Sequence, residues 1–305
     1  MDKKNLISAA ADTARRNQRY VVWFYLLNLV FAWLGATGLG THAQAILGHS
    51  LYADKLLHGF DLAVLLELIN RPEFGGSSGA TTPARIFAVL FFLASLTFMP
   101  GVLLGYSSDH RISRDEFFRA CGRNVWRFVR LFLFLAVIAG VVAGILFAVE
   151  GALAKAADQT SYERLPFFTH LASLAVIFLV LTAIRIWFDL AQTEVVLRDQ
   201  GAVRKSVASG FRMMRRNLGR LLGSYVAIAM TALLVLVAGI LLWHTIVPPA
   251  SVLGSFLILQ ATLLLLLGMR FWQRAAAVAF YVRQAAEPAS ETQPTSVVAV
   301  PSVVA

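Results

Sequence analysis

The chain has 305 residues, of which 58% are hydrophobic and only 14% are charged, and its formal net charge is +10. A soluble domain of this length carries about 25% charged residues, so the composition excludes that class and indicates a polytopic membrane protein. Because most of the positive charge flanks apolar segments, we expect its partner to be lipid headgroup phosphate and not nucleic acid.

Six apolar segments approach the ~20 residues that a helix needs to cross a bilayer. Residues 1–19 are polar and basic, and the first span follows at about residues 20–40. This run is longer than the apolar part of a signal peptide, so we predict an uncleaved transmembrane helix. The other spans are predicted at about residues 86–106, 128–149, 168–188, 221–243 and 252–271.

Two segments outside the spans have their own character. Between the first two spans, Leu57, Phe60, Val64 and Leu68 recur at helical spacing, which predicts helices lying in the outer membrane interface. Residues 285–305 have low complexity and predict a disordered cytoplasmic tail. We therefore expect one all-α membrane domain over residues 1–284.

Lysine and arginine gather on one side of the predicted spans. The opposite side holds only Lys55, Arg71, Arg85, Lys155 and Arg164. By the positive-inside rule, this asymmetry predicts that both termini lie in the cytoplasm.

A basic amphipathic motif occurs twice, with a constant spacing of 93 residues. In each copy arginines share one helical face and apolar residues share another, the pattern of a helix on a membrane surface before it turns into the membrane. Ser113 and Glu116 form a capping-box pattern that starts the first copy. The matched residues are Phe118, Arg119, Arg123, Asn124 and Arg127 in the first copy and Phe211, Arg212, Arg216, Asn217 and Arg220 in the second.

A second correspondence extends this repeat to the spans that follow. Arg185-Ile186-Trp187 ends the fourth span, and Arg270-Phe271-Trp272 ends the sixth. Spans three and four thus form one helical hairpin, and spans five and six repeat it. The N-terminal hairpin keeps only Arg16-Asn17 of the motif, so it is the weakest of three parallel copies.

These residues resemble a known group of proteins. The runs FFRACGRNVWRFVRL, RIWFDLA and FRMMRRNLGRLL look like those of uncharacterised bacterial six-span membrane proteins. More loosely, the pattern is similar to the membrane domain of some glycerophosphodiester phosphodiesterases, although their catalytic barrel is missing. The resemblance implies a bacterial inner-membrane location and carries over no catalytic residues.

One cluster of polar residues has the chemistry of a metal site. Asp54, His58 and Asp61 lie at helical spacing in the outer loop. They would offer oxygen and imidazole ligands, but the solvated face of an interfacial helix explains them better. With no other constellation of nucleophiles, carboxylates or metal ligands, we predict no enzymatic activity and no cofactor.

Two further sets of polar residues lie in or beside the spans. Asn28 and Gln260 lie near span centres, where they either line a pathway or, as we favour, form interhelical hydrogen bonds. Arg185 and Asp189 form an i, i+4 pair, which we interpret as a partly buried ion pair and not as a gate.

Small residues form a ridge along the third span, at Ala136, Gly140, Gly144 and Ala148. Such a ridge lets another helix approach closely. We expect that helix to come from the same chain, with a membrane-protein partner or a second copy as the alternative.

The two arginine faces allow two interpretations. Their residues (Arg119, Arg123, Arg127, Arg212, Arg216 and Arg220) either fix topology by reaching lipid headgroups or converge into a cytoplasmic cradle for an anionic lipid or an acidic partner segment. The sequence therefore predicts a non-catalytic, lipid-interacting or assembly-type bundle. A transporter or channel component is the main alternative, and a membrane enzyme acting on lipid headgroups is the third.

Overall fold

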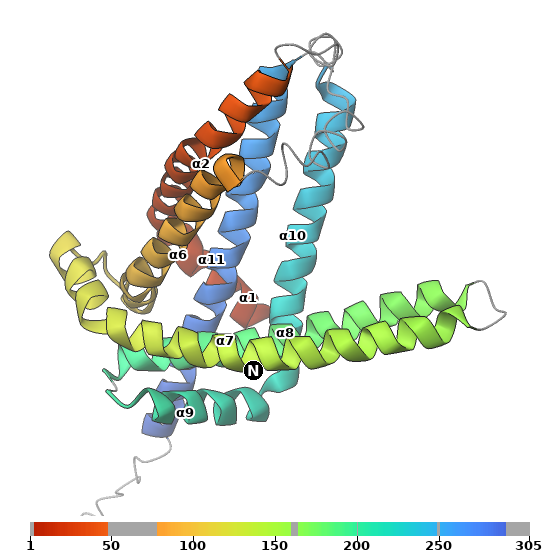
Figure 1. The fold of residues 1–305 in the computed structure, drawn as a ribbon. Coiled ribbons are helices and arrows are strands. Elements are labelled where there is room, and N and C mark those ends of the chain that lie inside the picture. The colour runs from red at the N-terminus through yellow and green to blue at the C-terminus, as the bar shows by residue number, and fades with distance from the viewer. Residues whose placement is uncertain (1–2, 48–77, 160–163, 200, 249–250, 291–305) are drawn as a thin grey trace, which may run out of the picture.

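The computed structural model describes residues 3–47, 78–159, 164–199, 201–248 and 251–290. Within these ranges the chain forms eight helices and no strand. The helices are α1 (Lys3–Arg16), α2 (Gln18–Leu47), α6 (Ser78–Ser107), α7 (Arg114–Asp158), α8 (Leu165–Leu197), α9 (Val203–Arg216), α10 (Leu218–Ile246) and α11 (Val252–Ser290) (Figure 1).

Six of these helices are long and apolar enough to cross a membrane: α2, α6, α7, α8, α10 and α11. The prediction of an all-α protein with six spans is confirmed. Helix α11 continues to Ser290, so it includes the first six residues of the tail that the sequence predicts from residue 285. The predicted interfacial helix in the outer loop falls within residues 48–77, outside the described part of the chain.

The long helices form three hairpins, α2 with α6, α7 with α8, and α10 with α11. Figure 1 shows α2, α6, α10 and α11 rising from a common base, whereas the α7–α8 hairpin lies across them and projects to one side. The short helices α1 and α9 lie at the same base.

The buried side chains concentrate where the three hairpins meet. This region, which we call the base, is defined by the buried residues Leu6, Tyr20, Val102, Phe128, Leu190, Leu221 and Ala276. Away from the base the apolar side chains are exposed, as at Val137 (65%) and Val141 (58%) on α7. The hairpins are thus held together at one end, and lipid is expected to cover their remaining apolar surface.

The N-terminus of α7 begins as the sequence predicts. The backbone N–H of Ser113 donates to Glu116 Oε2 at 2.8 Å, and the N–H of Glu116 donates to Ser113 Oγ at 3.2 Å. The two side chains satisfy two N–H groups that a helix start leaves free. However, α7 continues unbroken from Arg114 to Asp158. The basic amphipathic segment of the first copy and the span that follows it are therefore one continuous helix.

Three asparagines occupy the junctions between amphipathic segments and spans. The side-chain amides of Asn17, Asn124 and Asn217 each donate to a carbonyl oxygen four residues earlier, at 3.1, 3.0 and 3.3 Å. At Asn17 and Asn217 a short helix ends and a span begins at the next residue. The asparagine therefore forms the same side-chain hydrogen bond in all three hairpins, although the helix breaks at only two of them.

Two tryptophans attach the ends of spans to the short helices. Trp187 Nε1 on α8 donates to the carbonyl oxygen of Val207 on α9 at 2.7 Å. Trp272 Nε1 on α11 donates to the carbonyl oxygen of Ile7 on α1 at 3.2 Å. The contact between α11 and α1 joins the two ends of the described chain at the base.

Candidate functional site at the base of the helices

Asp189 on α8 is a buried carboxylate in the base, with 7% of its surface exposed. Its Oδ2 accepts a hydrogen bond from the hydroxyl of Tyr225 on α10 at 2.9 Å. Arg185 Nε lies 3.8 Å from the same oxygen, so the predicted Arg185–Asp189 ion pair is present but long. Tyr225, which the sequence did not indicate, is the closer partner.

Gln273 on α11 holds the other side of Tyr225. Gln273 is buried, and its Nε2 donates to the backbone carbonyl oxygen of Tyr225 at 3.3 Å. Polar contacts therefore join α8, α10 and α11 at a single residue.

Arg274 follows on the same helix, and its guanidinium has few acceptors among the described residues. Its Nη1 lies 2.6 Å from the sulfur of Met99 on α6, which is a weak acceptor. Its Nε is buried and has no hydrogen-bond partner among the described residues. It also interacts electrostatically with Asp189 and Arg185, which places three charges near one another.

The sequence contained one signal for Arg274. Apolar residues follow it from Ala275 to Val282, so this arginine lies inside an apolar run and not at its border. Because Arg274 lies just beyond the sixth predicted span, a reader of the sequence would assign it to the membrane border and expect it to be exposed.

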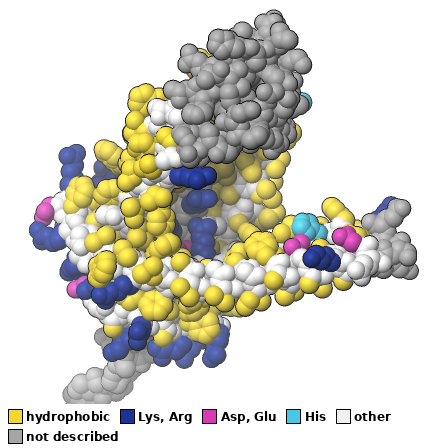
Figure 2. Space-filling view, viewed as in Figure 1, with side chains coloured by type: hydrophobic (Ala, Val, Ile, Leu, Met, Phe, Trp, Pro, Cys, Tyr) yellow, Lys and Arg dark blue, Asp and Glu magenta, His cyan; other side chains and the backbone are white. Residues whose placement is uncertain are grey.

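A hollow opens between α7 and the upright helices, and Figure 2 shows Lys or Arg side chains within it. Arg270 is exposed one helical turn before Arg274 on the same face of α11. Arg185 and Arg274 both interact with the carboxylate of Asp189, so two arginines share one carboxylate here, with Arg270 one turn from Arg274. The local charge is therefore positive.

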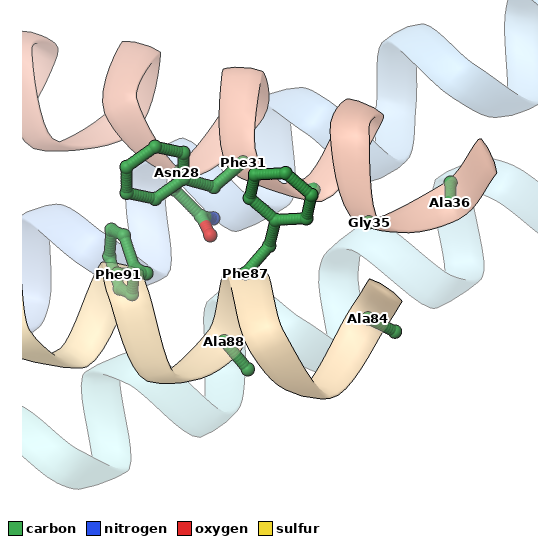
Figure 3. Close-up of a pocket in the computed structure, with 9 residues that line it drawn as sticks. Asn28, Phe31, Gly35, Ala36, Ala84, Phe87, Ala88 and Phe91 are labelled. Carbon is green, nitrogen blue, oxygen red and sulfur yellow. The ribbon is translucent and has the colours of Figure 1, made fainter. Parts of the chain in front are cut away.

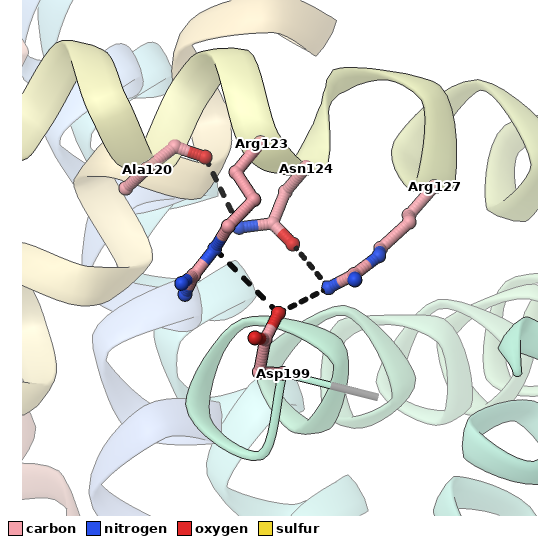
Figure 4. Close-up of polar contacts among 5 residues, drawn as sticks. All are labelled: Ala120, Arg123, Asn124, Arg127 and Asp199. Atoms are coloured by element: carbon pink, nitrogen blue, oxygen red, sulfur yellow. Dashed lines mark hydrogen bonds and ion pairs between the residues drawn. The ribbon is translucent and has the colours of Figure 1, made fainter. Parts of the chain in front are cut away.

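Three arginines of α7 form ion pairs within the chain, and Figure 4 shows two of them, Arg123 and Arg127. Arg127 Nη1 donates to Asp199 Oδ1 and, at 3.1 Å, to Asn124 Oδ1. Arg123 Nε lies 3.5 Å from the same oxygen of Asp199. Arg119 instead pairs with Asp115 one turn earlier, at 2.6 Å.

Asp199 holds these arginines from the segment that follows α8. Its φ of 50° lies in the left-handed region, which aspartate tolerates better than most residues. The hydrogen bond from Arg127 and the nearby charge of Arg123 lower the pKa of Asp199. The carboxylate therefore remains charged and neutralises part of the α7 face.

The basic residues of α9 differ from those of α7. Arg212 and Arg216 are exposed and form no ion pair with a described residue. Arg220, on α10, is half-buried, and its Nε has no hydrogen-bond partner in the described ranges. The structure brings Arg123 and Arg127 together at Asp199, but the described contacts do not join them to Arg212, Arg216 or Arg220.

Asn28 lines a pocket of about 370 Å³ between α2 and α6, with Phe31, Phe87 and Phe91 (Figure 3). Gln260 does not line this pocket. Its Oε1 accepts from the hydroxyl of Tyr25 at 3.0 Å, which joins α11 to α2 as the favoured interpretation predicted. Asn28 and Gln260 therefore do not share one pathway.

The small-residue ridge on α7 has no partner among the described helices. Ala136, Gly140, Gly144 and Ala148 are all exposed. A Cβ added at Gly140 or Gly144 would meet no atom within 4 Å. The expectation that a helix of the same chain packs on this ridge is therefore wrong for the described part of the structure.

The outer-loop cluster of Asp54, His58 and Asp61 lies outside the described residues. Within the described ranges, no group of three or more His, Cys, Asp or Glu side chains is arranged to hold a metal ion.

Comparison with models of known protein families, with curated proteins and with solved structures gives no match to this chain.

Proposed function

We propose that this chain is a non-catalytic integral membrane protein that binds the phosphate of an anionic lipid headgroup through Arg185, Arg270 and Arg274. The observation that carries this proposal is Arg274, whose buried Nε has no partner among the described residues. A charged side chain in a membrane domain is costly and is usually paired or functional. The guanidinium fork matches phosphate geometry, so a phosphate would supply the missing acceptors.

Internal repetition supports a site shared between hairpins. We propose that three copies of one unit, an amphipathic segment followed by a hairpin, build the chain. The matching hydrogen bonds of Asn17, Asn124 and Asn217 support this origin. In this proposal Arg185 and Arg270 occupy equivalent positions in two units, and Arg274, one turn after Arg270, interacts electrostatically with Arg185.

A bacterial inner membrane with both termini in the cytoplasm is the location that accords with this proposal. The exposed face of α9 carries cations with no ion pair to a described residue (Arg204, Lys205, Arg212, Arg215 and Arg216). Such residues are retained on the cytoplasmic side, where they also attract anionic lipids.

Native mass spectrometry of the full-length protein, extracted with its lipids, tests the headgroup site. Arg270→Gln removes one exposed arginine of the site, and Arg85→Gln removes an exposed arginine from the start of α6 as a matched control. We expect the wild type and Arg85→Gln to retain an anionic lipid that Arg270→Gln loses. Equal retention in all three proteins would contradict the proposal.

The same experiment separates this site from the surface of α9. Arg212→Gln combined with Arg216→Gln lowers the charge of the exposed helix and leaves the base intact. We expect this double variant to keep its lipid. Loss of lipid only in the double variant would move the binding site from the base to α9.

A further inference from the structure

A second pocket, of about 330 Å³, lies where the end of α1 meets the loop between α6 and α7. Tyr106, at the end of α6, forms one wall and is itself buried. None of Arg185, Arg270 and Arg274 lines this pocket, although its wall Tyr106 interacts electrostatically with Arg274, so the two sites are tested with separate variants.

One set of lining side chains consists of hydrogen-bond donors for an anion. Arg16 comes from the last turn of α1, whereas His110 and Arg111 come from the loop after α6. The two loop residues are exposed and form no ion pair with another described residue. Two guanidinium groups and an imidazole are suited to the oxygens of a phosphate group.

The remaining polar groups can act as acceptors, and the hydroxyl donors of Thr13 and Ser108 are already used. The hydroxyl of Thr13 donates to the carbonyl oxygen of Ala9 at 2.9 Å, and the hydroxyl of Ser108 donates to that of Leu104 at 2.9 Å. The amide nitrogen of Asn17 donates to the carbonyl oxygen of Thr13, which leaves its Oδ1 free to accept.

A carboxylate completes this second set of groups. Asp109 lines the same pocket and is exposed. Its oxygens can only accept hydrogen bonds while it is ionised. A ligand that carried phosphate alone would meet repulsion from Asp109, whereas a ligand with an ammonium group would meet attraction.

We propose that this pocket binds a phosphoethanolamine group, with its phosphate at Arg16, His110 and Arg111 and its ammonium at Asp109. A primary ammonium has three N–H groups, which can donate to Asp109 and to two of the acceptors of Asn17, Thr13 and Ser108. A phosphocholine group has no N–H to donate and is usually held by an aromatic cage. The pocket therefore distinguishes the primary amine from the quaternary one.

Two sources supply this group, the headgroup of a membrane phospholipid and a soluble phosphoethanolamine ester. Titration of the full-length protein in detergent with soluble phosphoethanolamine, phosphocholine and inorganic phosphate measures the second source. Titration with short-chain phosphatidylethanolamine and phosphatidylcholine measures the first. We expect at least one amine ligand to bind about tenfold more tightly than its choline counterpart, as a lost charge-assisted hydrogen bond implies.

Two substitutions test the ammonium-binding and the phosphate-binding groups of the pocket separately. Asp109→Asn should weaken binding of the amine ligand about tenfold and leave inorganic phosphate unaffected, whereas Arg111→Gln should weaken both. Asp158→Asn and Arg114→Gln remove exposed charges outside the pocket and should change neither. Thermal unfolding of each variant checks that the protein is folded.

Each result of these titrations decides one part of the proposal. Preference for the lipid over the soluble ester would identify the headgroup as the source, and the reverse would identify a cytosolic ligand. Equal binding of amine and choline ligands, or an unchanged affinity in Asp109→Asn, would overturn the assignment. Binding that the Arg114→Gln control weakens as much as Arg111→Gln would show a general charge effect and would also overturn it.

Discussion

The hydroxyl of Tyr225 on α10 and the carboxylate of Asp189 on α8 form a 2.9 Å hydrogen bond inside the base. Tyr225→Phe removes this donor and leaves a buried carboxylate with Arg185 as its remaining close partner. We expect a loss of about 1–3 kcal/mol in the free energy of unfolding, the usual cost of an unsatisfied buried group. Chemical unfolding in mild detergent measures this difference.

Tyr106→Phe is the matched control for that substitution. It removes the same atom from a tyrosine that is also buried at the base, but this hydroxyl has no hydrogen-bond partner among the described residues. We expect its stability to equal or exceed that of the wild type. If both variants lost the same free energy of unfolding, the hydrogen bond to Asp189 would contribute nothing to stability.

Asp199 gives the protein a specific acid sensitivity. Because its pKa is lowered in the folded chain by Arg127 and Arg123, its contribution to stability is complete above the unfolded pKa of about 3.9. The contribution disappears as the pH falls through the lowered native pKa. We therefore expect the wild type to be more stable than Asp199→Asn at neutral pH and the two to converge in strong acid.

Thermal unfolding of both proteins across that pH range tests the prediction. Asparagine tolerates the left-handed backbone at least as well as aspartate, so Asp199→Asn isolates the charge from the conformation. Asp158→Asn, at an exposed position on α7, controls for the change in net charge. A stability difference between Asp199→Asn and wild type that persists unchanged in acid would contradict the ion-pair explanation.

Gly210 sets how closely α9 approaches α8. A Cβ at this position would lie 3.0 Å from the backbone nitrogen of Ala191 and 3.1 Å from the carbonyl oxygen of Trp187. Backbone atoms cannot rotate away as a side chain can. Gly210→Ala should therefore separate the helices and lower the free energy of unfolding by about 1–3 kcal/mol. A Cβ added at Gly144 would meet no atom within 4 Å, so Gly144→Ala should leave the free energy of unfolding unchanged. Similar unfolding curves for both variants would argue against close packing at Gly210.

The tryptophan contacts provide a test of the internal repeat. Trp187→Phe and Trp272→Phe each remove one N–H donor from an equivalent contact between a span and a short helix. We expect the two variants to lose similar amounts of unfolding free energy, about 0.5–1.5 kcal/mol for the hydrogen bond and more for the smaller ring. Trp33→Phe, at an exposed position on α2, should have a much smaller effect. A large loss in only one of the two buried variants would show that the contacts are not equivalent.

Local features of the fold could be read from the sequence. The spans follow from the length of apolar runs, and the capping box at Ser113 and Glu116 involves residues only three apart. The Arg185–Asp189 pair likewise joins neighbouring turns of one helix. In each case the partners are close in sequence, so helical geometry alone brings them together.

The candidate site depends on contacts that no local pattern encodes. Tyr225 meets Asp189 from another helix, and Arg274 meets Met99 across most of the chain. Asp199 reaches Arg127 only because the backbone turns into the left-handed region after α8. The Arg-Asn motif could not predict where a helix breaks either, because α7 continues through Asn124 whereas α9 ends before Asn217.

The crosswise α7–α8 hairpin has a mechanical consequence. At 1.5 Å per residue, the 45 residues of α7 extend for about 68 Å, more than twice the ~30 Å hydrocarbon thickness of a bilayer. The basic N-terminal part of α7 is suited to the membrane surface, whereas its exposed apolar residues from Leu133 onward gain most by immersion, and a helix that is long for the bilayer is accommodated by tilting. Because the hairpin is fixed only at the base, we expect a thinner membrane to spread it further from α10 and a thicker one to draw them together.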